Sequence, residues 1–197
     1  TRNSGEISRH LRGTDFESKP EDEDHLVDDY PLLPTRRRFW ERVLRAVDEA
    51  GTKSQLRTQL KLVDEAVKQT AQEPLGSVVA GDFIYEDLRS DLLQSGVLAN
   101  DIDTRIEQVR TEEEDELGAR LCALTFLIGK LPREEGVDTG LRATPETFAD
   151  LLVKDLKEGS GTLRDHVEDR LDQLVEKGIL MQVEGEYRMQ TQESQEW

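Results

Sequence analysis

The chain has 197 residues, of which 43 are acidic and 26 are basic, and its formal net charge at pH 7 is −17. This balance argues against a general nucleic-acid-binding surface, because such surfaces need an excess of Lys and Arg to meet phosphates. A single cysteine excludes an internal disulfide framework and is typical of a reducing compartment. Because the sequence shows neither a signal peptide nor an apolar run of membrane-spanning length, we expect a cytoplasmic segment without membrane contact.

The acidic bias itself has two interpretations. Abundant Asp and Glu with little Lys is typical of halophilic proteins, which stay soluble where salt screens charges strongly. An ordinary acidic protein from a GC-rich genome has a similar composition, so the sequence supports both interpretations equally.

Residues 1–29 are polar and carry the acidic run Glu21–Asp24. With few apolar side chains, they lack the surface to form a core of their own. We therefore predict a flexible acidic linker, or a tail that rests on a domain outside this chain. A weak helix around residues 6–11 is the only regular structure that the pattern allows there.

Residues 30–110 predict a helical domain. Pro31 and Pro34 hold their segment extended, and the apolar spacing then predicts helices over 35–50, 53–71 and 84–94, with a further helical run over 102–109. Thr52 and Gln55 form a capping box for the second of these helices. Its buried stripe is expected at Leu56, Leu60, Val63 and Val67.

The triplet Arg36-Arg37-Arg38 is the basic cluster of the sequence. In one interpretation it is the solvated first turn of a helix. In the other it is a contact for a phosphate or for an acidic partner.

Residues 111–191 predict three helices followed by a β-hairpin. An apolar stripe over 117–131 predicts the first helix, and Thr144 caps the second, with Pro145 in its first turn. Thr162, with Asp165 as the acid of a capping box, begins the third helix.

The third helix ends at Gly178, and strands over 179–183 and 186–190 flank a turn at Glu184-Gly185. Three helices in helix-turn-helix order followed by a hairpin constitute a winged helix. The expected fold class is therefore mainly α, a helical domain followed by a winged helix, with residues 192–197 as a tail truncated from a longer chain.

The sequence carries no catalytic motif. His10, His25 and His166 are far apart and have no metal-ligand spacing. The stretch Gly51–Ser54 has its residues in the wrong order for a phosphate loop, and helices are predicted on both sides of it. We expect no catalytic residue, metal or cofactor in this segment.

Arg164, Arg170 and Arg188 are the predicted nucleic-acid contacts, on the third helix and the hairpin. A helix that reads the major groove presents hydrogen-bond donors and cations to the DNA. The same helix carries five acidic residues, which are Asp165, Glu168, Asp169, Asp172 and Glu176. We therefore expect any binding to DNA to be weak, and the winged helix to serve mainly for packing or protein contacts.

Several further residue patterns resemble a known family. They are Tyr30–Pro34, Arg37–Glu41, Gly51-Thr52, Gln55–Arg57, Gln59-Leu60, Pro74–Gly76, Gly81–Phe83, Tyr187–Thr191 and Glu196-Trp197. In these residues the chain is similar to the large P-loop proteins of BREX and phage-growth-limitation systems (BrxC/PglY). The order of a helical region and a winged helix also resembles the C-terminal half of AAA+-type ATPases, where a helical lid and a winged helix follow the nucleotide-binding core.

The resemblance implies a parent ATPase in phage defence, with ATP and Mg²⁺ held by a P-loop core upstream in the same chain. Its partners would be a DNA methyltransferase and an alkaline-phosphatase-like protein. Residues 30–110 would be the lid-like domain. Arg57, which lies off the apolar stripe of its helix, matches the sensor-2 arginine that reaches the terminal phosphate of the nucleotide; a solvated helix arginine is the equal alternative.

A competing class is a stand-alone acidic winged-helix transcriptional regulator that binds DNA as a dimer. The two classes differ in an observable way. The ATPase requires a longer parent chain with a phosphate loop upstream, whereas the regulator requires a chain that starts near residue 1.

Overall fold

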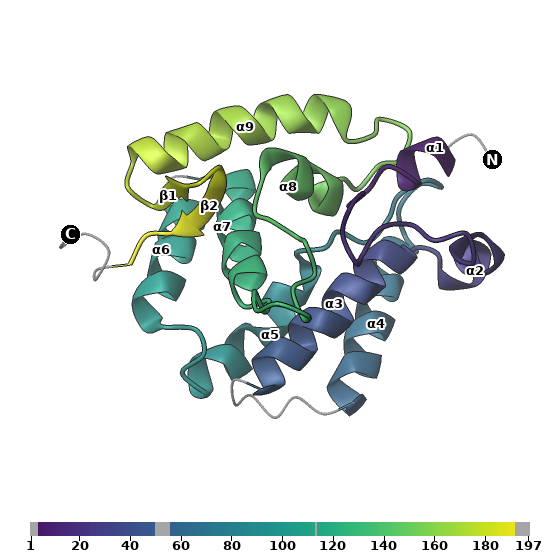
Figure 1. The fold of residues 1–197 in the computed structure, drawn as a ribbon, viewed down its shortest axis with the longest axis horizontal. Helices are drawn as coiled ribbons and strands as arrows, with labels where there is room; N and C mark the ends of the chain where they lie inside the picture. Colours follow the sequence, from purple (N-terminus) through teal and green to yellow (C-terminus); the bar gives the residue numbers. More distant parts are fainter. Residues whose placement is uncertain (1–3, 50–55, 113, 192–197) are drawn as a thin grey trace.

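The structure is a computed structural model that describes residues 4–49, 56–112 and 114–191. Within these residues the chain is mainly helical, with one two-stranded antiparallel sheet, as the sequence predicts (Figure 1). The helices are α1 (Ser4–Ile7), α2 (Asp22–Asp29), α3 (Pro34–Val47), α4 (Leu56–Thr70), α5 (Phe83–Gln94), α6 (Asn100–Thr111), α7 (Glu116–Gly129), α8 (Pro145–Leu152) and α9 (Gly161–Glu176). The strands are β1 (Leu180–Val183) and β2 (Glu186–Met189).

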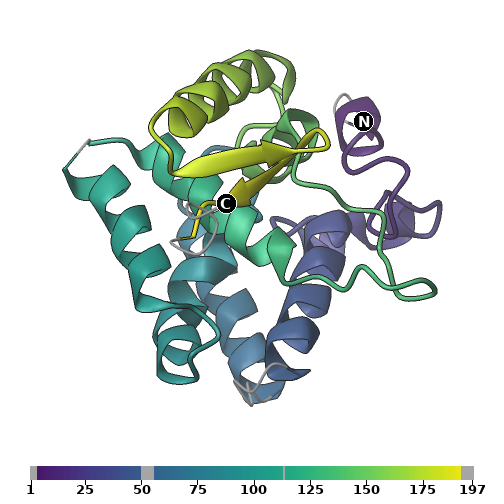
Figure 2. The ribbon, with the colours of Figure 1, turned by 60° about the vertical axis from the view of Figure 1, so that its left-hand side comes forward.

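Helix α7 lies at the centre of the molecule (Figures 1 and 2). The sequence predicted one buried stripe on this helix, but Cys122, Ala123 and Thr125 beside that stripe are buried as well. Helix α6 packs against α7, and so do α5, α9 and strand β2. A helix with apolar residues on all sides is stable only when it is enclosed in this way. Helix α7 therefore packs both against helices that precede it in the chain, α5 and α6, and against elements that follow it, α9 and β2.

One hydrophobic core runs through both halves of the chain. It extends from Leu11 and Phe39 through the residues of α7 to Tyr187 in the hairpin. The predicted domain boundary near residue 111 does not separate two cores, because helices from both sides of it pack onto α7. Since separate domains each enclose their own core, the described residues share one folded unit.

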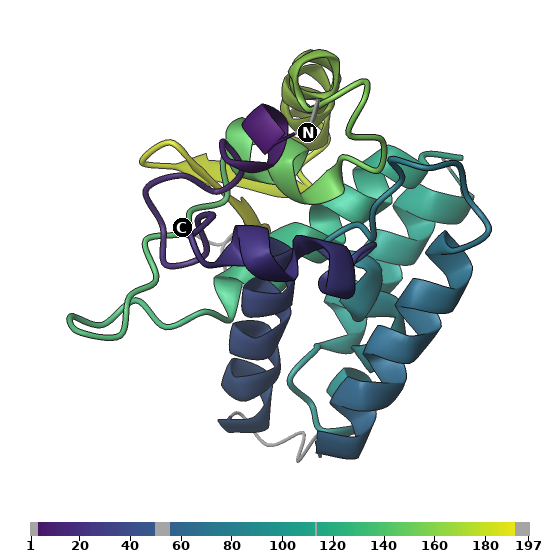
Figure 3. The same ribbon diagram turned by 90° about the vertical axis from the view of Figure 1, so that its right-hand side faces the viewer.

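Helices α3 and α4 run in opposite directions (Figure 3). The buried face of α4 differs from the predicted stripe. Leu62 and Ala66 are fully buried, whereas Val63 and Val67 are only half-buried. Helix α4 packs against α5, and the direction of this neighbour determines which face is covered. The side chains of Leu56 and Leu60 and the proposed Thr52 cap lie outside the described residues.

The starts of α8 and α9 show one correct and one wrong prediction. The Thr144 side chain accepts a hydrogen bond from the Thr147 amide at 3.4 Å, and Pro145 occupies the first turn of α8. Helix α9 instead begins at Gly161, one residue before Thr162. The side chain of its N-cap residue, Ser160, makes no capping hydrogen bond. The Ser160 amide donates to the Glu6 carboxylate at 2.6 Å. An acid from a distant segment therefore stabilises this helix end, in place of a local capping box.

The hairpin follows the predicted pattern. Strands β1 and β2 pair in an antiparallel register that sets Val183 opposite Glu186. Glu184 and Gly185 between them have φ values of 53° and 83°. Positive φ at both central residues is the geometry of the tight turns that match the twist of paired strands.

Residues 4–29 are not the linker that their composition predicts. Ile7, Leu11 and Phe16 are buried against the rest of the protein. The Leu11 amide donates to the Asp150 carboxylate at 2.9 Å, and the Asp15 amide donates to the Thr139 carbonyl at 2.9 Å. A few correctly spaced apolar residues hold the segment in place because the surface that covers them comes from α3, α8 and the loops near them.

All three arginines of the Arg36–Arg38 triplet bond to other groups of the same chain. Arg36 is fully buried and donates hydrogen bonds to the carbonyls of Val79, Asp150 (3.1 Å) and Val153 (2.7 Å). Arg37 pairs with Asp29 at 2.8 Å, and Arg38 pairs with both carboxylate oxygens of Asp22 at 2.8 Å. The triplet is thus neither a solvated turn nor an open contact for a phosphate.

The Arg36 contacts join three parts of the chain. Residues 76–81 run in an extended path between the Pro31 segment and the end of α8, with the Val78 amide donating to Lys154 and the Gly81 amide donating to Leu151. The Val79 amide donates to the Pro31 carbonyl at 3.0 Å. The Arg36 side chain reaches this junction from α3 and donates its hydrogen bonds to the main-chain carbonyls there. Burial lowers the pKa of Arg36 to about 9, so the side chain remains charged at neutral pH.

Replacement of Arg36 tests this junction. Arg36→Met keeps the side-chain length but removes the donors of three main-chain carbonyls, so the free energy of unfolding should fall by about 3–5 kcal/mol. Urea denaturation followed by circular dichroism measures the change. Arg45→Ala on the exposed side of the same helix is the control and should change stability by no more than about 0.5 kcal/mol. A similar stability for the Arg36→Met variant and the wild type would contradict the assignment.

Candidate functional site

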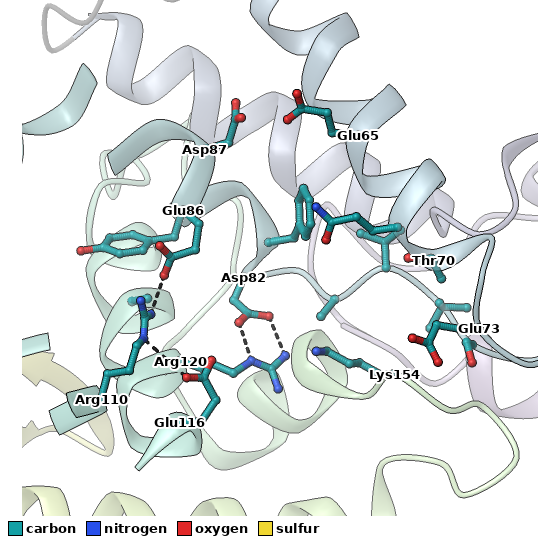
Figure 4. Close-up of a pocket in the computed structure, with 18 residues that line it drawn as sticks. Glu65, Thr70, Glu73, Asp82, Glu86, Asp87, Arg110, Glu116, Arg120 and Lys154 are labelled. Atoms are coloured by element: carbon teal, nitrogen blue, oxygen red, sulfur yellow. Dashed lines mark hydrogen bonds and ion pairs between the residues drawn. The ribbon is translucent and has the colours of Figure 1, made fainter. Parts of the chain in front are cut away.

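A cleft with a volume of about 650 Å³ lies between α4, the segment 77–82, α5 and the start of α7 (Figure 4). Its walls carry six carboxylates and three cationic groups. The carboxylates are Glu65, Glu73, Asp82, Glu86, Asp87 and Glu116, and the cations are Arg110, Arg120 and Lys154. The cleft is therefore acidic, like the molecule as a whole.

Two arginines organise one end of the cleft. Arg120 of α7 makes a two-pronged ion pair with Asp82, with distances of 2.6 and 2.8 Å, and both side chains are mostly buried. Arg110 of α6 contacts Glu86 at 2.5 Å and Glu116 at 3.5 Å. The planar guanidinium matches two carboxylate oxygens at once. These pairs fix α5, α6 and α7 relative to one another, so they are structural contacts of the cleft wall.

At the other end of the cleft, Glu65 has only an exposed ion pair, with Lys61 at 3.5 Å. Glu65 and Asp87 lie near one another (Figure 4), and burial, followed by the charge of Glu65, raises the pKa of Asp87. Among the described residues the Lys154 ammonium has no hydrogen bond or ion pair, and it lines the opposite wall. A surface with excess carboxylates can receive the Lys or Arg side chains of another protein. The described residues include no group of three or more His, Cys, Asp or Glu side chains placed to hold a metal ion.

The predicted site residues are not brought together. Arg57 belongs to α4, but its side chain lies outside the described residues. Arg164 and Arg170 lie in α9, two turns apart, and Arg188 lies on β2. Arg170 is held in ion-pair contact with Asp115, and Arg188 is exposed.

The solvent-facing side of α9 is acidic. Asp165, Glu168, Asp169, Asp172 and Glu176 are all exposed. The apolar side with Val167, Leu171 and Leu174 faces the core. Arg164 and Arg170 are half-buried at the edges between these two sides. A DNA duplex that approached this helix would meet carboxylates first, and they would repel its phosphates.

The ion pair of the cleft was not anticipated from the sequence. Asp82 and Arg120 are 38 positions apart, in segments that the pattern assigned only to a loop and to a helix. A charged residue within the apolar run of α7 is the one local signal. It indicates a buried charge that needs a partner, but it does not identify that partner.

Comparisons with protein-family models, with curated proteins and with solved structures gave no match for this chain. Across the part of the chain that the structure describes, no helix combines the length and the apolar character needed to cross a membrane.

The Asp82–Arg120 pair should be strongly coupled. Arg120→Met leaves a mostly buried carboxylate without its partner, so this change should cost about 3–5 kcal/mol of unfolding free energy. Asp82→Asn together with Arg120→Met should cost clearly less than the sum of the two single changes. Urea denaturation of the four proteins completes this double-mutant cycle. Lys61→Ala, at an exposed ion pair with Glu65, is the control with an expected change below about 1 kcal/mol; simple additivity at Asp82 and Arg120 would contradict the coupling.

Proposed function

We propose that this chain is a non-catalytic segment of a P-loop ATPase in a BREX-type phage-defence system, with a lid-like helical part followed by a winged helix. The order of α7, α8 and α9 followed by the β1–β2 hairpin supports the winged helix, since α8 and α9 pack on each other and α9 contacts both α7 and β1. In this proposal, helices α3 to α6 form the lid-like part. The residue patterns over 30–197 support the family assignment.

The observation that carries the functional part of this proposal is the charge on α9. The exposed side of this helix presents carboxylates, and Arg170 is tied to Asp115 of its own chain. Such a helix favours contacts with basic protein surfaces over contacts with DNA. The acidic cleft beside α4 and α5 has the same preference. We therefore assign the winged helix a role in protein contacts within the ATPase assembly.

In this assembly, ATP and Mg²⁺ bind to a P-loop core upstream in the parent chain. The lid-like part closes over that core, and Arg57 serves as the nucleotide sensor. The BREX methyltransferase and the alkaline-phosphatase-like component are the proposed protein partners, and the acidic surfaces of α9 and of the cleft are the proposed places of contact.

The charge on α9 predicts weak DNA binding. Duplex DNA should bind this chain only at high-micromolar to millimolar concentration, without sequence preference, because few cations are available to release counterions from the phosphates. A fluorescence-anisotropy titration in low salt measures this affinity. Nanomolar binding to one sequence would support the alternative transcriptional regulator and remove the protein-contact assignment.

The sensor assignment is tested in the longer parent chain that this proposal requires. Arg57→Ala should lower ATP hydrolysis by at least roughly tenfold, because a charge that meets the transferring phosphoryl group stabilises the transition state. Phosphate release with magnesium and ATP is the measurement. Lys61→Ala, one turn further along α4, is the matched control and should retain full activity. Equal activity of the Arg57→Ala variant and the wild type would make Arg57 a solvated side chain, and a parent chain without a phosphate loop would refute the ATPase proposal itself.

A further inference from the structure

A cavity of about 410 Å³ lies along the outer edge of strand β2. Its walls come from Ile102 of α6, from the end of α7 and the start of the loop after it, from Ala143 and from residues 186–191. Among the described residues, those of β1 do not line it. Strand β1 packs on α9, whereas β2 packs on α7, as Figure 2 shows. The cavity therefore lies beside the edge of the sheet that is turned away from β1.

The main-chain groups at this edge of β2 are only partly paired. The Gln190 amide donates to the Ile179 carbonyl of the neighbouring chain segment at 3.0 Å. Because hydrogen-bonded and non-hydrogen-bonded pairs alternate along an antiparallel ladder, the amides of Tyr187 and Met189 point away from β1. The Tyr187 amide accordingly donates to the Ala143 carbonyl at 2.9 Å. The Met189 amide has no hydrogen-bond acceptor among the described residues, so it is free to pair with a further strand.

The wall of this cavity holds two cations without an anionic partner, although the chain is acidic. The Lys130 ammonium lies 4.9 Å from the centroid of the Phe126 ring, and the Arg188 side chain is exposed. Neither cationic group has a hydrogen bond or ion pair with another described residue. Burial lowers the pKa of Lys130, and no described carboxylate counteracts this effect. An anion in the cavity would stabilise both charges.

The remaining charges around the cavity are balanced. Arg133 pairs with Glu186 at 3.0 Å, and Glu186 is the one carboxylate among the lining residues that the structure describes. Glu186 also contacts Arg142 at 3.2 Å, and Arg142 has Asp138 as a further partner at 2.6 Å. These side chains form a group of two cations and two anions. Lys130 and Arg188 therefore supply the net charge that a ligand in the cavity would meet.

The floor of the cavity is apolar. Phe126 and Tyr187 are buried, and Ile102 and Met189 pack against the core with part of their surface uncovered. A ligand that carried charge alone would leave this surface in contact with water. A ligand with an apolar side chain between its anionic groups would cover it.

We propose that this cavity is the docking site of a short, extended, acidic segment of another protein, which adds as a strand to the free edge of β2 at Met189. In this mode of recognition, main-chain hydrogen bonds supply affinity and side-chain contacts supply specificity. Lys130 and Arg188 provide that specificity, because they favour a segment with carboxylates. The inference goes beyond the proposed contacts of the acidic surfaces and does not depend on the ATPase proposal.

The two cations lie on different sides of the added strand. Successive side chains of a strand point to opposite sides of a sheet, so Arg188 points away from the side of Tyr187 and Met189. The latter side faces α7, where Phe126 and Lys130 line the cavity. A segment with carboxylates on both of its sides therefore fits best, with an apolar residue placed against Phe126.

A nucleic acid fits the same features less well. It lacks the regular amide and carbonyl groups that pair with the edge of a strand. The exposed acidic side of α9, on the same hairpin module, also repels an extended polyanion. A short acidic peptide places its few charges at the cavity alone.

Fluorescence anisotropy with the 197-residue chain and a labelled peptide tests the site. The acetylated and amidated peptide EVEEVE presents carboxylates and a valine on each side when it is extended. We expect saturable binding that weakens as KCl is added. The peptide KVKKVK should bind at least roughly tenfold more weakly, because its charges repel the two cations. EVEEVE with alternate amides N-methylated should show a similar loss, since it keeps the charges but cannot pair as a strand.

Substitutions in the chain separate the two cations from the rest of the surface. Lys130→Met and Arg188→Met should each weaken the binding of EVEEVE by roughly tenfold, since each removes a charge-assisted contact. Arg45→Met removes an exposed arginine elsewhere and should leave the affinity unchanged. Arg188 is exposed, so its replacement removes no buried side chain and protects the test from a folding artefact. Hydrogen exchange at the Met189 amide, followed by NMR, should slow when EVEEVE is added.

Four outcomes would overturn the proposal. The absence of saturable binding up to about 5 mM EVEEVE, above a dissociation constant of about 1 mM, would refute the site. Equal affinities of EVEEVE for the Lys130→Met and Arg188→Met variants and the wild type would refute the role of the cations, and unchanged binding of the N-methylated peptide would refute strand addition. Tighter binding of a short single-stranded DNA than of EVEEVE would assign the site to nucleic acid. A tenfold gain in affinity on replacing Glu193 and Glu196 together by Gln would assign it to carboxylates of the chain itself.

Discussion

The buried guanidinium of Arg36 is the contact on which the arrangement of this protein depends. It comes from the first turn of α3 and donates to main-chain carbonyls that lie 43, 114 and 117 positions further along the chain. A buried charge is tolerated only when its donors find acceptors, so α3, residues 76–81 and the end of α8 must meet at one place. The Pro31 segment is part of the same junction through its hydrogen bond with Val79. The helical part and the α7–α9 part are thereby held together at their shared edge.

A second constraint is the use of arginine within an acidic chain. Arg38 pairs with Asp22, Arg89 with Asp103, Arg120 with Asp82 and Arg170 with Asp115. These pairs join separate segments of the chain, and the five carboxylates of α9 face solvent. The result is a surface that repels polyanions. The proposed protein contacts through α9 follow from this distribution of charge.

The central position of α7 also limits how the parts of the structure can move relative to one another. In the described residues α7 packs against α5 and α6 on one side and against α9 and β2 on the other. The core is continuous across this helix, so a motion of the lid-like part relative to the hairpin part would expose apolar surface at a cost of about 25 cal/mol per Å². The two parts are therefore expected to move as one body.

The sequence by itself determined the helices from α3 to α9, their order and the hairpin, but it did not predict α2. Helical periodicity, Thr144 with Pro145, and Glu184-Gly185 are local signals, because they depend on residues within a few positions of one another. The tertiary structure alone decided that Arg36 is buried and that Leu62 and Ala66 form the covered face of α4. It also decided that the Glu6 carboxylate accepts a hydrogen bond from the Ser160 amide at the start of α9. It also decided that residues 4–29 are docked, although their composition predicts a linker. Each of these features depends on which distant surface covers a residue, and the free energy of a buried charge or apolar side chain is set by that surface and not by its neighbours in the chain.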